Sequence, residues 1–119
     1  MNKVILIGNL TADPEVKATA KGVYVANIRL ATDTYAGKDD DGKAKVHTEY
    51  HRLVAFGKIA EFAGQHLHKG RCVSIEGKLQ TSSWTDQAGQ KRYRTEVVVD
   101  EVRFVGARPA AAAAETEAA

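Results

Sequence analysis

At 119 residues, the chain is long enough to bury one hydrophobic core and has a short appendage. Its single cysteine, Cys72, excludes an internal disulfide, and no apolar run is long enough to cross a membrane. Of the 17 basic and 15 acidic residues, Glu115 and Glu117 follow Arg108, and removing these two acids leaves the body at +4. The single cysteine and the absence of a long apolar run lead us to expect a cytoplasmic protein. The net charge of the body is only mildly basic and does not by itself indicate nucleic-acid binding.

The first half of the chain predicts two strands followed by a loop. Asn2 to Leu10 is a compact run of Val, Ile and Leu that ends at a turn. Val23 to Thr34 alternates apolar and polar residues and predicts the second strand. Tyr35 to Lys45 contains two glycines and three consecutive aspartates, which is typical of a mobile hairpin loop. Consecutive aspartates do not have the alternating spacing of an EF-hand, so a calcium site is not indicated.

Thr48 to Lys58 predicts a third, central strand, which Gly57 ends. With a period of two, one face carries Tyr50, Arg52, Val54 and Phe56, and the other carries His51, Leu53 and Ala55. A guanidinium between two aromatic rings suits a wet surface that binds bases and phosphates. The pattern fits equally well a half-buried strand whose arginine stem lies across its neighbours.

The second half predicts one helix and two further strands. Lys58 to Leu67 has a narrow apolar stripe at helical spacing, and Gly70 suits the end of a helix. Arg71 to Trp84 and Arg92 to Val105 predict the last two strands. The segment 107–119 is mostly alanine and predicts a disordered tail, although an alanine-rich helix is an alternative.

The expected order is strand, strand, strand, helix, strand, strand. This order predicts an all-β domain over residues 1–106, a five-stranded oligonucleotide-binding (OB) barrel with one helix between strands three and four. The only tryptophan, Trp84, stands among polar residues, where it either contacts a ligand or caps the end of the core.

Several separate motifs, in order, resemble the bacterial-type single-stranded DNA-binding protein family. The similarity runs from Asn2 to about Val105 and rests on NKVILIGNL (2–10), DPE (13–15), VANI (25–28), TEYHR (48–52), FGK (56–58), IEG (75–77) and WTD (84–86). The resemblance implies a non-enzymatic OB-fold homotetramer that coats single-stranded DNA in replication, recombination and repair. It implies no cofactor.

The resemblance also implies which residues meet DNA. Its base-stacking aromatics correspond to Tyr35, Tyr50, Phe56 and Trp84, although well-known members have tryptophan at the first two positions. Its cations or polar groups along the DNA path correspond to Lys3, Arg52, Lys58 and Lys69. His51 corresponds to a position that supports subunit association. Residues 80–83 are neutral where well-known members are basic, so phosphate binding there is in doubt.

The C-terminal segment departs most from the family. Typical members end in a long linker and an acidic tip with a terminal aromatic, which recruits replication and repair enzymes. Here Arg108-Pro109 leads to alanines and two glutamates. This predicts a short paralogue or truncated form that binds DNA but recruits those enzymes weakly or not at all. The alternative function is that of an OB-fold assembly or accessory protein with weak nucleic-acid binding. A nuclease is not indicated, because no set of carboxylates or histidines converges.

Overall fold

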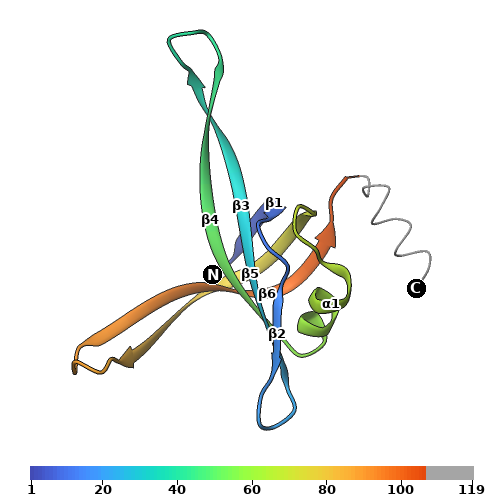
Figure 1. Ribbon diagram of the computed structural model, residues 1–119, viewed down its shortest axis with the longest axis vertical. Helices are drawn as coiled ribbons and strands as arrows, with labels where there is room; N and C mark the ends of the chain where they lie inside the picture. Colours follow the sequence, from blue (N-terminus) through green and yellow to red (C-terminus); the bar gives the residue numbers. More distant parts are fainter. Residues whose placement is uncertain (107–119) are drawn as a thin grey trace.

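The computed structural model describes residues 1–106, and the tail predicted for 107–119 lies outside the described residues. The described chain forms six strands and one helix (Figure 1). Their bounds are β1 Val4–Leu10, β2 Glu15–Ala18, β3 Tyr24–Lys38, β4 Ala44–Phe56, α1 Lys58–His66, β5 Cys72–Thr85 and β6 Lys91–Phe104. No helix within residues 1–106 has the length and apolarity that crossing a membrane requires.

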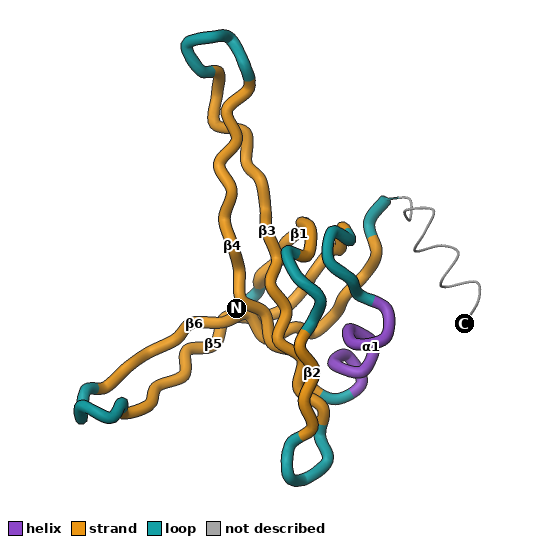
Figure 2. The backbone as a smooth tube through the Cα atoms, in the orientation of Figure 1, coloured by secondary structure: helices purple, strands orange, loops and turns teal. Residues whose placement is uncertain are grey.

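Five of the strands form a ring. The sheet order is β1-β5-β6-β4-β3-β2, and an additional pairing of β1 with β3 returns the sheet to its first strand. Two register pairs make that closure, Asn9 with Ala31 and Leu10 with Leu30. The helix lies beside the ring, between β4 and β5 in the chain (Figure 2). The predicted five-stranded OB barrel with one helix after its third main strand is therefore confirmed.

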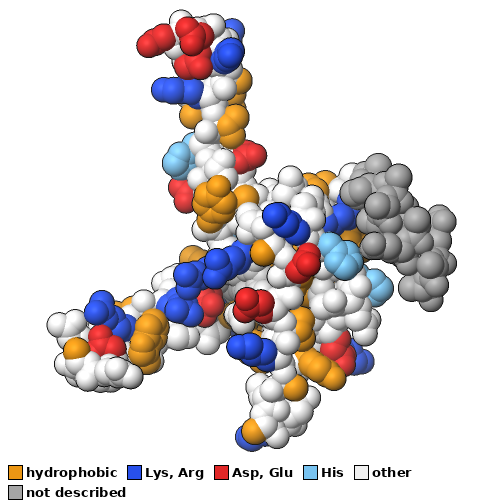
Figure 3. All heavy atoms as spheres, viewed as in Figure 1, with side chains coloured by type: hydrophobic (Ala, Val, Ile, Leu, Met, Phe, Trp, Pro, Cys, Tyr) orange, Lys and Arg blue, Asp and Glu red, His pale blue; other side chains and the backbone are white. Residues whose placement is uncertain are grey.

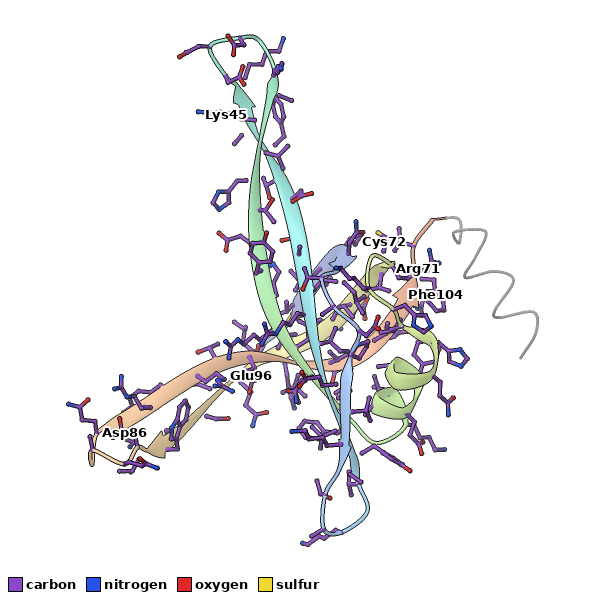
Figure 4. All side chains as sticks on the ribbon, in the orientation of Figure 1. Lys45, Arg71, Cys72, Asp86, Glu96 and Phe104 are labelled. Carbon is purple, nitrogen blue, oxygen red and sulfur yellow. The ribbon has the colours of Figure 1, made fainter. Side chains whose placement is uncertain are left out.

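The core fills the inside of this ring, because alternate residues of each strand point inward. Ile28 and Leu30 of β3, Leu53 of β4 and Ile75 of β5 are at most 1% exposed. The buried alanines of α1, Ala60 and Ala63, pack against them. Arg71, directly before β5, is also buried. Its guanidinium carbon lies 4.6 Å from the centre of the Phe104 ring, and both residues are labelled in Figure 4.

Two glycines allow strands of the ring to approach closely. A Cβ on Gly8 of β1 would lie 2.1 Å from the Ala31 carbonyl oxygen of β3. A Cβ on Gly77 of β5 would lie 2.2 Å from the Val98 carbonyl oxygen of β6, next to a register shift between those strands. Ring closure and the β5–β6 bulge therefore each require glycine, because a residue with a Cβ would collide with the backbone of the neighbouring strand.

Two hairpins extend well beyond the barrel as arms, β3–β4 and β5–β6 (Figure 1). The same device holds the turn at each tip. In the β3–β4 arm, Asp39 Oδ1 accepts hydrogen bonds from the backbone N–H groups of Asp41 and Lys43, each at 2.9 Å. In the β5–β6 arm, Asp86 Oδ1 accepts from Ala88 and Gln90, also at 2.9 Å. An aspartate that caps its own turn in this way sets the register of the whole arm.

The structure corrects two expectations. The loop predicted for Tyr35 to Lys45 is wrong, because β3 continues to Lys38 and β4 begins at Ala44. Tyr35 pairs with Val46 in the ladder, so only the tip is a turn. Backbone hydrogen bonds between β3 and β4 stabilise this segment as strand, and the local composition does not reveal such pairing. The short strand β2 was not predicted, and it forms by adding to the edge of β3.

Candidate nucleic-acid interface

Most of the aromatic side chains of this protein lie outside its core. The chain has eight Phe, Trp and Tyr residues, and six of them are exposed by 41% or more. Only Phe62 and Phe104 pack against the core. Aromatic rings usually contribute much of a core's buried area. Six exposed rings are therefore available for contact with a ligand that has flat apolar surfaces or with another protein surface.

The pairing of β3 with β4 places three of the predicted stacking residues on one face. Tyr35 pairs with Val46, and Tyr50 and Phe56 follow Val46 at even spacings along β4. These rings are 64%, 72% and 50% exposed. At about 3.4 Å per residue, Tyr50 and Phe56 stand about 20 Å apart along the strand. We call this outer face of β3–β4, with Arg52 between the two β4 rings, the stacking face.

Arg52 is exposed, whereas its neighbours Leu53 and Ala55 are 1% and 0% exposed. The alternation predicted for the central strand is therefore confirmed. Because Arg52 is exposed, the alternative of a half-buried strand with the arginine stem lying across its neighbours does not apply. Its guanidinium stands on the same face as the rings of Tyr50 and Phe56.

Trp84 lies on the β5–β6 arm and not at the end of the core. It is 45% exposed and pairs with Arg92 across the arm. The Arg94 guanidinium carbon lies 5.4 Å from the centre of its ring, at the distance of a cation–π contact. Residues 80–83 of β5 are neutral, but the facing strand β6 supplies Lys91, Arg92 and Arg94. The arm therefore has basic side chains despite the neutral segment, and Figure 3 shows basic side chains along it.

The other predicted cations differ in their surroundings. Lys58 is exposed at the first residue of α1, directly after Phe56 and Gly57. Lys69 is exposed in the loop after α1, where its backbone N–H donates to Asp13 Oδ1 at 2.8 Å. Lys3 precedes β1, and its Nζ lies 3.2 Å from Glu76 Oε2 in a surface ion pair. Such a pair holds Lys3 weakly. The role of each in binding DNA stays a prediction.

His51 lies on the opposite face of β4 from Tyr50 and is half-buried. Its Nε2 is 2.7 Å from the Thr32 hydroxyl of β3, within hydrogen-bonding distance. The structure holds one copy of the chain, so the predicted role of His51 in subunit association stays a prediction.

Sequence reasoning missed two arginines near these residues. Arg29 of β3 pairs directly with Arg52 of β4, so both stand on the stacking face. Arg94 approaches from the β5–β6 arm, and all three line one cavity of about 340 Å³. The alternation of the second strand already placed Arg29 on its polar side. The register between β3 and β4 was the missing information.

One acid on the β5–β6 arm has a perturbed pKa. The pKa of Asp86 lies below its ordinary value of 3.8, chiefly because Arg92 Nε donates to its Oδ2 at 2.8 Å. The backbone N–H groups of Gln90 and Ala88 lower it further. Within residues 1–106, no group of three or more His, Cys, Asp or Glu residues could hold a metal ion. The site thus consists of exposed rings and cations, which suits binding of a flat, anionic polymer.

The comparison with known families agrees with this geometry. The model of the single-strand binding protein family matches residues 1–105, which is nearly the whole chain. The chain belongs to the single-strand binding protein family. The resemblance found in the sequence motifs is therefore confirmed. This single-strand binding family is a non-enzymatic DNA-binding family.

A solved structure of the same family has a similar fold. It is a Plasmodium falciparum SSB in complex with ssDNA, 29% identical to this chain, with a TM-score of 0.78. The match covers 89% of this chain and 96% of that one. The likeness in fold therefore extends over most of both chains.

Proposed function

We propose that this protein binds single-stranded DNA with little regard to base sequence. The observation that carries the proposal is the stacking face, where Tyr35, Tyr50 and Phe56 expose their rings on one surface with Arg52 between two of them. Trp84 offers a fourth ring on the neighbouring arm. Membership of the single-strand binding family and the likeness to an SSB–ssDNA complex support the same conclusion.

The mechanism follows from the chemistry of the two partners. Every base has a π face, so stacking on a tyrosine or tryptophan ring does not depend on base identity. Lysine and arginine side chains replace the counterions of the phosphates, so the affinity falls as salt rises. A duplex hides its base faces inside the stack and offers only its phosphates. The protein therefore prefers single strands.

In the cell, this activity places the protein on exposed strands during replication, recombination and repair, at the nucleoid in the cytoplasm. It acts as a homotetramer. Ile5 and Ile7 on the outer side of β1 are 62% and 58% exposed, which supports burial of that side against another copy. His51, half-buried beside Thr32, contributes to association between subunits.

Fluorescence anisotropy with labelled oligonucleotides of one length tests the proposal. Poly(dT), a mixed-sequence strand and the matching duplex are titrated with the protein at several salt concentrations. We expect similar affinities for the two single strands, much weaker binding to the duplex, and affinities that fall with salt. An equal preference for duplex, or no binding in a protein that still assembles, would favour an assembly or accessory role instead. Incubation of the labelled strand with magnesium should leave it intact.

A further inference from the structure

The outer surface of the barrel is hollowed where β2, β3, β4 and β6 meet. The hollow has a volume of about 340 Å³, and residues from all four strands line it. It lies on the stacking face, because Arg52 is part of its lining and stands between Tyr50 and Phe56 on β4. A strand stacked on both rings has to carry its backbone across this hollow.

Arg29 and Arg52 stand side by side in the lining of this hollow. They are direct register partners in the antiparallel ladder of β3 and β4. Like charges in this position destabilise a sheet. The ion pairs of the described chain, residues 1–106, involve Lys3, His47, Arg92 and Arg103 and so leave both arginines unpaired. The pairing of two like charges therefore does not itself stabilise the sheet, whereas an anion bound between the two guanidiniums would be held by both.

A third guanidinium reaches the same hollow from the β5–β6 arm. Arg94 lines it, and the same side chain lies over the Trp84 ring. Arg94 thus lies between the stacking face, whose hollow it lines, and the Trp84 ring on the arm. Basic side chains run along this arm to its junction with the barrel in Figure 3.

Three carboxylates, Asp13, Glu15 and Glu96, also line the hollow and balance the three arginines in number. Asp13 Oδ1 already accepts the backbone N–H of Lys69. Glu96, labelled in Figure 4 near the base of the β5–β6 arm, precedes Val97, the parallel partner of Leu53. These acids weaken the attraction for small free anions. The hollow is therefore suited to a phosphate that neighbouring stacked bases already hold in place.

We propose that Arg29, Arg52 and Arg94 form a clamp for a backbone phosphodiester of the bound single strand, in which Arg29 and Arg94 are binding residues beyond those of the family resemblance. This clamp rests on the proposed binding of single-stranded DNA. Guanidinium groups suit the role because each can donate two parallel hydrogen bonds to phosphate oxygens.

The test measures how the affinity for poly(dT) depends on salt. For single strands, the slope of log K against log[salt] changes by about 0.7 for each phosphate contact. We expect Arg29→Gln and Arg94→Gln each to reduce the steepness of that slope by about 0.7, and the double variant to bind about tenfold more weakly at low salt. Arg29→Lys should keep the slope, because it keeps the charge.

Arg103→Gln is the matched control. It also removes one positive charge from an exposed arginine of β6, but that arginine is paired with Glu101 at 2.7 Å and lies outside the hollow. It should bind like the wild type. Thermal unfolding without DNA should show that Arg29→Gln is at least as stable as the wild type, since it relieves the opposition to Arg52.

The clamp would be overturned if Arg29→Gln and Arg94→Gln both gave the same slope of log K against log[salt] as the wild type and Arg103→Gln. A wild type that fails to bind poly(dT) would instead overturn the proposed function, so the two failures are distinguishable. A last comparison replaces chloride with inorganic phosphate at matched ionic strength. Any additional loss of affinity in phosphate should disappear in the double variant, because free phosphate competes with the strand for the clamp. A loss that persists in the double variant would place the phosphate-sensitive contacts outside the hollow and count against the clamp.

Discussion

Replacing Trp84 with alanine tests whether a base stacks on the β5–β6 arm. Trp84 is 45% exposed on a two-stranded arm, and Arg94 lies 5.4 Å from its ring centre. Alanine substitutions at stacking positions of single-strand binding proteins themselves cost about 1–3 kcal/mol per base. At about 1.4 kcal/mol for each factor of ten, Trp84→Ala should weaken binding to poly(dT) by about 5- to 140-fold.

The structure supplies two controls for this substitution. Trp84→Phe keeps a flat ring, so it should lose less affinity than the alanine variant. Tyr93→Ala removes a ring of similar exposure, 65%, from the same arm. Tyr93 pairs with Ser83 while Trp84 pairs with Arg92, so the two rings point to opposite faces. Tyr93→Ala should therefore leave the affinity nearly unchanged.

Anisotropy titrations of the four proteins against one labelled poly(dT) oligonucleotide give the comparison, and circular dichroism checks that each variant is folded. The reasoning is refuted if folded Trp84→Ala binds as tightly as the wild type. It is also refuted if Tyr93→Ala loses as much affinity as Trp84→Ala, because the face of the arm would then not matter.

Three further predictions concern assembly, ring closure and the β5–β6 turn. His51→Lys places a charge at a half-buried position of the proposed interface, so light scattering should show the mass falling from four chains toward two or one; an unchanged mass would remove His51 from the interface. Gly8→Ala brings a Cβ to 2.1 Å from the Ala31 carbonyl oxygen, so urea unfolding should show a stability lower by about 1–3 kcal/mol, and equal stability would count against closure of β1 on β3. The pKa of Asp86 is depressed in the folded state. The ionised Asp86 carboxylate therefore stabilises the fold at pH values above its ordinary pKa of 3.8, and this stabilisation is lost as the pH falls through the folded-state pKa. An NMR titration should place the Asp86 midpoint below 3.8 and move it upward in Arg92→Gln, and a midpoint that does not respond would exclude Arg92 as the main cause.

Sequence patterns predicted the elements that local chemistry determines. The alternation in β4 correctly assigned Leu53 and Ala55 to the core and Tyr50 to the surface, because a period of two is a direct consequence of strand geometry. The apolar spacing of α1 and its first residue, Lys58, were also predicted correctly. The family motifs then indicated the barrel into which these elements assemble.

The patterns failed where pairing between strands decides the outcome. The segment 35–45 has the composition of a loop, yet a ladder with β4 extends β3 to Lys38. Four residues of β2 are strand only because the edge of β3 is available to them. The opposition of Arg29 and Arg52 depends on a register that alternation within a single strand does not contain. The residues added to the site came from this cross-strand information.

The most direct test of the stacking account is the emission of Trp84, the only tryptophan in the chain, during titration with DNA. Because Trp84 is exposed on the arm, a base that stacks on its ring will change its surroundings. We predict strong quenching that saturates with poly(dT) and much weaker quenching with a duplex of equal length. Emission that stays unchanged at saturating single strand, with binding verified by anisotropy in the same sample, would contradict it.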